Sequence, residues 1–250
     1  MLTEERQAAI LRILAQKHIV KNNDLALELN TSISTIRRDL QELEDAHKLI
    51  RIHGGAKLLD AVLAEPSMSE KTNQHPKAKT LIAQAAVKYI KDGDTIFLDA
   101  GTTTFAMINH LAHKNITVVT NSIGHAKALS DAKITTYILG GMIKETTQAI
   151  IQATANEQLK ALHFDCAFLG TNTIHSTFGY MTPDLEEANI KKIAIEQSQK
   201  SYILADHSKF EHIAFAQFAD LAKATIITDY IPTDCQELFN NQTTIKEINK

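Results

Sequence analysis

Hydrogen-bonding side chains cluster between residues 32 and 41 at helical spacing. The apolar residues of this segment predict one buried stripe on a helix: Ile33, Ile36, Leu40 and Leu43. The opposite face then carries five polar residues: Ser34, Thr35, Arg37, Arg38 and Gln41. Guanidinium groups bind guanine edges or phosphates with two parallel hydrogen bonds, and hydroxyl groups contact phosphates or bases. This face therefore suits a nucleic acid, although an ordinary solvated helix has a similar surface.

The neighbouring elements are those of a winged helix-turn-helix. Apolar residues at positions 10, 11, 13 and 14 predict a first helix, and a second helix is expected from Asn23. The alternating run 49–55 predicts a small β-hairpin that ends in a glycine pair, which would let the wing approach a phosphate closely. The helix cap and the hairpin add five expected DNA contacts: Ser32, Arg51, His53, Gly54 and Gly55. A helix in this setting docks its N-terminal half in the major groove.

Overall charge does not by itself indicate a nucleic-acid partner. The net charge is −3, and the first 60 residues contain nine Lys and Arg against nine Asp and Glu, so the positions of the charges must carry the evidence. No run approaches the roughly 18 apolar residues of a membrane span, and the N-terminus lacks a signal peptide pattern, which predicts a cytoplasmic protein. Cys166 lies in the short apolar run 164–169, so it is expected to be buried. Neither Cys166 nor Cys235 has the spacing of a metal site or a nucleophile, and no metal or cofactor is expected.

Strand-like and helix-like segments alternate beyond residue 75. Residues 81–90 predict a helix, and short β-branched runs predict six strands: 95–98, 116–120, 134–139, 164–169, 202–205 and 224–228. This alternation predicts a parallel α/β sheet covered on both faces. Pro66 and Pro76 lie in a polar stretch that predicts a connector. The expected organisation is a winged helix-turn-helix at 1–57, a linker at 58–75 and an α/β domain at 76–250.

A glycine- and threonine-rich loop follows the first of these strands. The backbone N–H groups and hydroxyls of residues 101–104 favour an anion at a helix N-terminus. Three other strands end in small or polar residues, and strand ends converge at the carboxyl edge of a parallel sheet. Carboxylates suit sugar hydroxyls and ammonium groups suit phosphate, although Glu187 and Lys191 alone would equally form an i,i+4 surface pair. The expected effector-binding residues are Asp99, Gly101, Thr102, Thr103, Thr104, Asn121, Ser122, Gly140, Gly141, Lys144, Gly170, Asp184, Glu187, Lys191, Asp206 and Lys209.

Several ordered runs of this chain resemble one known family. Residues 34–40, followed by Leu43-Glu44 and by the run 51–56, resemble the DNA-binding segment of the DeoR family of bacterial sugar-responsive repressors. The runs 98–103, 182–188 and 204–210 resemble its sensor domain. The resemblance covers essentially the whole chain, and within the family it is greatest to fructose operon repressors of low-GC Gram-positive bacteria. That likeness is carried by residues 1–7 together with the runs 98–103, 182–188 and 204–210.

This resemblance implies a repressor of a sugar operon, with fructose as the first candidate. It implies a sensor fold akin to ribose-5-phosphate isomerase, with double-stranded operator DNA and a phosphorylated sugar such as fructose 1-phosphate as partners. Dimers or tetramers are expected, because paired recognition helices bind paired half-sites. A different phosphosugar, an activating role and an isomerase-like enzyme with a fused DNA-binding module are the alternatives. The enzyme is disfavoured because a fold alone does not imply a function, and no catalytic residue is assigned.

Three positions depart from the family pattern, which usually has glycine there: His47, Gln152 and Thr173. If the glycines of relatives have positive φ at the last two positions, Gln152 and Thr173 are expected to be strained or to reshape their loops. The turn at His47 is expected to be kept, because histidine tolerates a left-handed conformation better than most residues.

Overall fold

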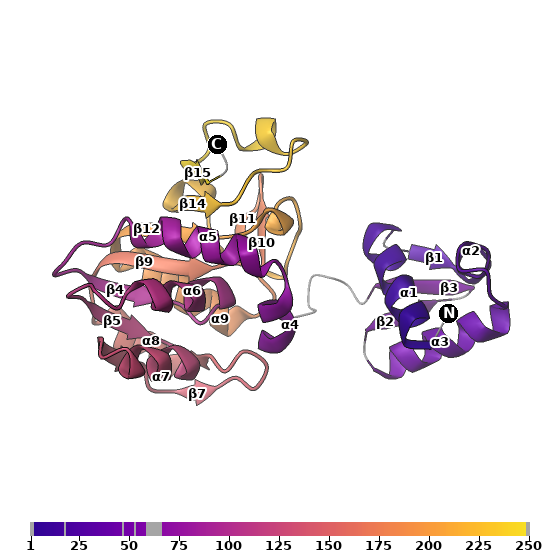
Figure 1. Ribbon diagram of the computed structural model, residues 1–250, viewed down its shortest axis with the longest axis horizontal. Coiled ribbons are helices and arrows are strands. Elements are labelled where there is room, and N and C mark those ends of the chain that lie inside the picture. Colours follow the sequence, from indigo (N-terminus) through magenta and orange to yellow (C-terminus); the bar gives the residue numbers. More distant parts are fainter. Residues whose placement is uncertain (1–2, 18, 47, 53, 59–66, 249–250) are drawn as a thin grey trace. The chain divides into compact units, whose positions relative to one another are not determined.

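The computed structural model describes residues 3–17, 19–46, 48–52, 54–58 and 67–248 (Figure 1). The chain divides into two compact units, Met1–Ala64 and Glu65–Lys250. The boundaries predicted at residues 57 and 76 stay predictions. Of the predicted connector, residues 59–66 lie outside the described part, and the remainder includes a helix, α4 (Met68–Asn73). Ser67 caps this helix together with Glu70, in a reciprocal capping box.

The N-terminal unit has the predicted helices and hairpin. Its elements are α1 (Thr3–Lys17), β1 (Ile19–Lys21), α2 (Asn22–Glu28), α3 (Ile33–Asp45), β2 (Leu49–Ile52) and β3 (Gly55–Leu58). The strands form an antiparallel sheet in the order β1-β3-β2. Strand β1 was not predicted, because three residues are too few to show an alternating pattern.

The core of this unit contains most of the predicted stripe of α3. Ile36, Leu40 and Leu43 are buried with residues of α1 and α2. The prediction for Ile33 is wrong, because its side chain is 40% exposed. Ile33 is the first residue of α3, so the buried stripe begins one turn later.

A seven-stranded parallel sheet forms the centre of the C-terminal unit. The strand order is β15-β14-β12-β9-β4-β5-β6, and the predicted strands are confirmed within a few residues. The sheet strands are β4 (Thr95–Leu98), β5 (Thr117–Thr120), β6 (Thr135–Ile138), β9 (Phe164–Gly170), β12 (Ser198–Leu204), β14 (Thr225–Thr228) and β15 (Ile245–Glu247). The smaller strands are β7 (Met142–Ile143), β8 (Ile150–Ile151), β10 (Thr173–His175), β11 (Gly179–Thr182) and β13 (Ala216–Ala219).

Helices cover both faces of this sheet. They are α5 (Pro76–Val87), α6 (Thr102–Met107), α7 (Ile123–Asp131), α8 (Ala153–Lys160) and α9 (Leu185–Glu196), with short 3-10 helices at Ile108–His110, His207–Lys209, Leu221–Lys223 and Gln236–Phe239. Alternate strand residues face opposite sides: Ile96 and Leu98 pack with residues of α5 and α6, whereas Phe97 packs with residues of α9. Helix α5 ends at Val87, earlier than the predicted residue 90. Cys166 is buried, as predicted.

The order of strands creates a switch point between β4 and β9. From β4 the chain proceeds through β5 to β6 on one side, and then returns to place β9 on the other side of β4. The connections on the two sides diverge there, which leaves a crevice at the carboxyl ends of both strands. This crevice is where the sequence predicts a ligand.

Candidate functional site

The outward face of α3 presents most of the predicted DNA-contacting residues. Ser34, Arg37 and Arg38 are exposed, and Thr35 and Gln41 are partly exposed. Ser32 caps the helix by accepting a hydrogen bond from the Thr35 backbone N–H at 3.1 Å. These side chains therefore lie on one exposed surface at the N-terminal half of the helix, the geometry that a recognition helix requires.

The wing is joined to this face by hydrogen bonds. Arg51 donates from its guanidinium to the Gln41 side-chain oxygen, and its backbone N–H donates to Glu44 Oε1 at 2.8 Å. Arg38 Nε lies 3.2 Å from Glu42 Oε1, in an exposed i,i+4 pair. Because such exposed pairs are weak, Arg38 is available to exchange this carboxylate for a phosphate or a base.

The two wing glycines have different roles. Gly54 is exposed with φ of +80°, and a Cβ there would meet nothing within 4 Å, so this position fits a close approach to a phosphate. Gly55 is buried, and its Cβ would lie 2.0 Å from the Val20 carbonyl oxygen. The burial of Gly55 does not favour the DNA contact predicted for it, and its missing side chain lets β3 lie against β1. His53 and the departure at His47 lie outside the described residues.

A partly buried ion pair between α1 and α3 was not predicted from the sequence. Arg6 Nε and Nη2 donate to the two carboxylate oxygens of Asp39 at 2.5 and 2.9 Å. The hydrogen bond to Asp39 raises the pKa of Arg6, against a smaller opposing effect of desolvation. The pair ties α1 to α3. Its partners are 33 residues apart, so local spacing carried no signal for it.

A polar cavity lies at the switch point between β4 and β9. Half of the predicted effector residues line it: Asp99, Gly101, Thr102, Thr103, Gly170, Glu187, Lys191 and Lys209. Asp99 is buried, where its Oδ2 accepts hydrogen bonds from the Gly170 N–H at 2.9 Å and from the Lys191 ammonium group. The cavity thus contains a fixed carboxylate beside a glycine-rich loop, with further lysines around it.

Three predicted residues lie beneath this loop and do not line the cavity. Thr104 donates to the Asp99 carbonyl at 2.6 Å and accepts from the Gly101 N–H at 3.1 Å. Asn121 Oδ1 accepts from the Ala100 N–H at 3.0 Å. Ser122 caps α7 and lies 2.7 Å from Nδ1 of His125. All three are buried, so they hold the loop in shape.

His125 completes this support under the loop. Its Nε2 lies 3.2 Å from Thr104 Oγ1. Burial lowers the pKa of His125 to about 4, because the charged form is disfavoured in the interior. The imidazole is therefore neutral near pH 7 and can serve the loop as a hydrogen-bond partner.

The remaining predicted residues lie around the cavity or away from it. Lys144 Nζ is 3.0 Å from Asp184 Oδ2 and 3.1 Å from Glu187 Oε1. Lys144 and Asp184 do not line the cavity themselves, but they lie beside Glu187, which does. Asp206 accepts from the Ser208 N–H at 3.0 Å and orders the turn that carries Lys209. The two glycines after β6, Gly140 and Gly141, are exposed and do not line the cavity, because the chain there turns away toward β7.

Sequence reasoning missed several lining residues, above all Lys71 and Lys79. Lys79 is 6% exposed, and its ammonium group donates to the Lys71 carbonyl. A signal for Lys79 existed, because it shares a helical stripe with Ile82, Ala83 and Ala86 of α5. A lysine on an apolar helical stripe is expected to be buried, and a buried charge is often part of a functional site. No local pattern marks Lys71.

Two departures from the family pattern have different outcomes. Gln152 has φ of +77° and ψ of −176°, a region that is nearly exclusive to glycine. The expectation of strain is confirmed there. Thr173 lies in β10 without a positive φ, so its backbone fits an ordinary residue.

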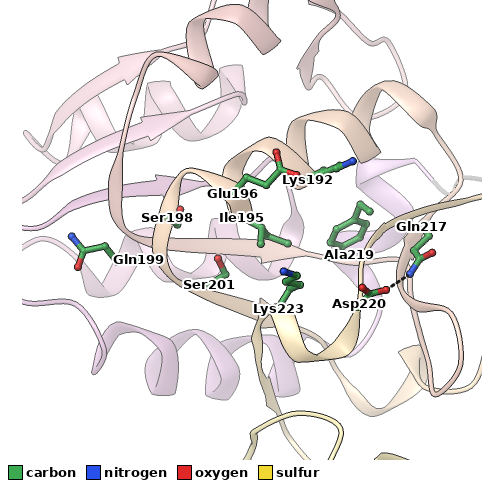
Figure 2. Close-up of a pocket in the computed structure, with 11 residues that line it drawn as sticks. Lys192, Ile195, Glu196, Ser198, Gln199, Ser201, Gln217, Ala219, Asp220 and Lys223 are labelled. Atoms are coloured by element: carbon green, nitrogen blue, oxygen red, sulfur yellow. Dashed lines mark hydrogen bonds between the residues drawn. The ribbon is translucent and has the colours of Figure 1, made fainter.

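A larger cavity of about 600 Å³ lies elsewhere, between α9, β12 and β13 (Figure 2). Figure 2 shows Lys192 and Glu196 of α9 on one side and Asp220 with Lys223 on the other. All four are exposed. Water solvates their charges, so this surface groove lacks the buried charges that mark the switch-point cavity as the candidate ligand site. Within the described residues, no group of His, Cys, Asp and Glu is placed to hold a metal ion.

Two family models match this chain. The DeoR-like helix-turn-helix domain matches residues 6–62, and the DeoR C terminal sensor domain matches residues 74–230. The chain belongs to the DeoR family. The helix-turn-helix match contains the exposed α3 face, and the sensor match contains most of the switch-point cavity. The resemblance derived from the sequence runs is therefore confirmed.

Curated relatives match over nearly their whole length. The uncharacterized HTH-type transcriptional regulator FruR of Bacillus subtilis is 44% identical over 96% of this chain and 95% of the relative. GlpR of Haloferax volcanii is 35% identical over 92% of this chain and 91% of the relative. The lactose phosphotransferase system repressor of Staphylococcus aureus is 33% identical, covering 92% and 93%. The DeoR-type chain is a DNA-binding transcriptional regulator and not an enzyme.

Among solved structures, ribose 5-phosphate isomerase A of Neisseria gonorrhoeae is similar to part of the chain. The TM-score is 0.40 at 20% identity, covering 53% of this chain and 52% of the isomerase. A likeness at this level says nothing about activity. None of the described helices is both long and apolar enough to cross a bilayer.

Proposed function

We propose that this DeoR-family regulator is a cytoplasmic repressor of a sugar utilisation operon, fructose being the first candidate, and that a phosphorylated sugar such as fructose 1-phosphate releases it from its operator. The observation that carries the proposal is the switch-point cavity, with the buried Asp99 carboxylate, the Gly101–Thr103 loop and four lining lysines. Carboxylates accept hydrogen bonds from sugar hydroxyls, and ammonium groups and backbone N–H groups bind phosphate.

The names of relatives support the sugar class. One relative is a lactose phosphotransferase system repressor. The runs that resemble fructose operon repressors support fructose, and the greater identity is with FruR, at 44% against 33%. Release from the operator requires that the effector bind the DNA-competent state less well than the released state, since equal affinity would shift nothing.

The proposal includes an assembly of two or more chains through the sensor units. Recognition helices of the helix-turn-helix class bind paired half-sites about one helical turn apart, which a dimer or tetramer can span. Ser34, Arg37, Arg38 and the wing residue Arg51 are assigned to the operator.

The deciding experiment is an operator gel shift titrated with fructose 1-phosphate, fructose 6-phosphate, galactose 6-phosphate, glycerol 3-phosphate and unphosphorylated fructose. We expect one phosphorylated sugar to release the operator, while fructose does not. The variant Thr103→Ala should keep operator affinity and require more effector, and Thr80→Ala, an exposed threonine on α5, should behave like the wild type. Operator binding that no phosphorylated sugar alters would refute the effector class.

A further inference from the structure

The switch-point cavity is too small for the ligand that its residues suit. Its volume is about 50 Å³, room for a water or two, whereas pockets for small organic ligands are about 300–1,000 Å³. A sugar phosphate therefore cannot enter unless a lining element moves. The identity of that element decides how occupancy reaches the rest of the chain.

Most of the lining is fixed in the core. Asp99 and Gly170 follow central strands β4 and β9, and Lys191 lies on α9, whose apolar residues belong to a large buried cluster. Helix α4 differs, although Met68 and Lys71 also line the cavity. It is six residues long and has no buried residue. Displacing α4 therefore exposes little buried apolar surface, so its free-energy cost is small.

Three lysines from different elements meet at this side of the cavity: Lys71 of α4, Lys79 of α5 and Lys209 after β12. Within the described residues, neither Lys79 nor Lys209 has a carboxylate within ion-pair distance, and Lys79 is almost fully buried. Burial lowers the pKa of both, and neighbouring lysine charges lower them further, against the opposing charge of Asp206. Mutually repelling ammonium groups held together in a cavity are stabilised when an anion binds between them.

We propose that Lys71, Lys79 and Lys209 form one anion subsite and that α4 is the lid over it, so that an anionic effector enters by displacing α4 and is then held by Lys71 of the re-seated helix. The proposal rests on the proposed function for the class of effector, and it adds the moving element. Hydrogen bonds hold α4 in place: the Met68 N–H donates to the Thr146 carbonyl at 3.4 Å, and the Lys79 ammonium group donates to the Lys71 carbonyl.

The lid is also the part of the sensor unit nearest in sequence to the DNA-binding unit. Residues 59–66 connect β3, the second strand of the wing, to Ser67 and α4. A change in the seating of α4 therefore acts directly on the chain that leaves the wing. Effector occupancy and DNA binding are then coupled through one short helix. Helix α4 has a seated and a displaced state, and both the effector and the operator change the balance between them.

Hydrogen exchange of the full-length protein tests the lid. With saturating fructose 1-phosphate, or with inorganic phosphate at millimolar concentration, exchange in residues 67–75 should change at least about fivefold, while α8 (Ala153–Lys160) stays unchanged. Fructose should have no effect. A ligand that raises the melting temperature and leaves the exchange of residues 67–75 unaltered would overturn the lid. Failure of every phosphate compound to bind would overturn the anion subsite as well.

Matched lysine variants test the role of Lys71. Lys71→Gln should keep operator affinity and need at least about tenfold more effector for release, as expected for loss of one charge-assisted hydrogen bond. Lys71→Arg should restore most of the response. Lys77→Gln is the control, since Lys77 is exposed on α5 and outside the cavity lining. If an effector releases the operator and Lys71→Gln responds like the wild type, the proposed function survives and this inference fails.

Discussion

Arg37 and Arg38 show how position outweighs total charge. The chain is acidic overall, yet these two guanidinium groups project from an exposed helix face whose opposite side is buried. Arg38 is paired with Glu42 of the same helix, whereas Arg37 has no such partner among the ion pairs of the described residues. Arg37 is thus the better candidate for a base contact.

Replacing Arg37 by alanine should weaken operator binding by about 1–3 kcal/mol if the guanidinium is bidentate to a guanine. A gel shift at fixed salt concentration measures the change. Arg12→Ala is the control, because Arg12 is an exposed arginine of the same unit that lies on α1. Equal losses in the two variants would mean that only the general positive charge matters.

Gln152 has a strained backbone conformation that strongly favours glycine. Its φ of +77° with ψ near 180° costs about 1–3 kcal/mol for a residue with a side chain. Gln152→Gly should therefore raise the free energy of unfolding by about 1 kcal/mol, after the entropy that glycine adds to the unfolded chain. Urea denaturation measures it. Glu157→Gly, inside α8, should lower stability by a similar amount, and a loss in both variants would contradict the strain.

At the scale of elements, the wing is positioned by contacts between segments distant in sequence. Strand β3 lies between β1 and β2, and the Asn22 N–H donates to the Gly54 carbonyl at 2.9 Å. The Arg6–Asp39 pair fixes α1 against α3 in the same unit. The orientation of the reading face thus depends on a three-stranded sheet whose first strand is only three residues long.

Gly55→Ala should destabilise the N-terminal unit by about 1–3 kcal/mol, the usual cost of overpacking. The added Cβ would lie 2.0 Å from the Val20 oxygen, and backbone cannot yield as a flexible side chain does. Thermal unfolding monitored by circular dichroism measures the effect. Gly124→Ala serves as control, because its nearest neighbour is 3.9 Å away and alanine favours the helix there. An unchanged melting temperature for Gly55→Ala would show that β1 can separate from β3.

At the scale of the whole molecule, two units have separate hydrophobic cores. One cluster fills the N-terminal unit, and two clusters cover the faces of the parallel sheet. Since each core is complete within its own unit, each unit is expected to unfold cooperatively by itself. The segment that precedes α4 is the covalent connection between the two units.

The full-length chain should unfold in two transitions. A bound effector should raise only the free energy of unfolding of the sensor unit, by about 2.7 kcal/mol at a hundredfold excess over Kd. Asp39→Ala should lower only the free energy of unfolding of the N-terminal unit. Differential scanning calorimetry with and without fructose 1-phosphate separates them. A single transition that both changes shift together would mean that the units fold as one.

Local pattern determined much of this protein from the sequence alone. The helices of the N-terminal unit, the wing hairpin and the six predicted strands follow from periodicities that each segment carries by itself. The Gly-Thr loop at 101–104 is also predictable from the sequence, because the end of an apolar strand and a following glycine are recognisable in a short segment. The departures at Ile33 and Gly55 arose because burial depends on which segment lies opposite.

Only the tertiary structure shows which residues distant in sequence lie close together. The Arg6–Asp39 pair spans 33 residues, and Lys71, Lys79 and Lys209 meet only because the sheet places the end of β12 beside α4 and α5. The same packing buries Thr104, Asn121 and Ser122 beneath the loop that they were expected to share with a ligand. The hydrogen-bonding groups of segments 32–41 and 101–104 can be recognised from local sequence. The lysines that surround the switch-point cavity and the small size of that cavity depend on the tertiary fold.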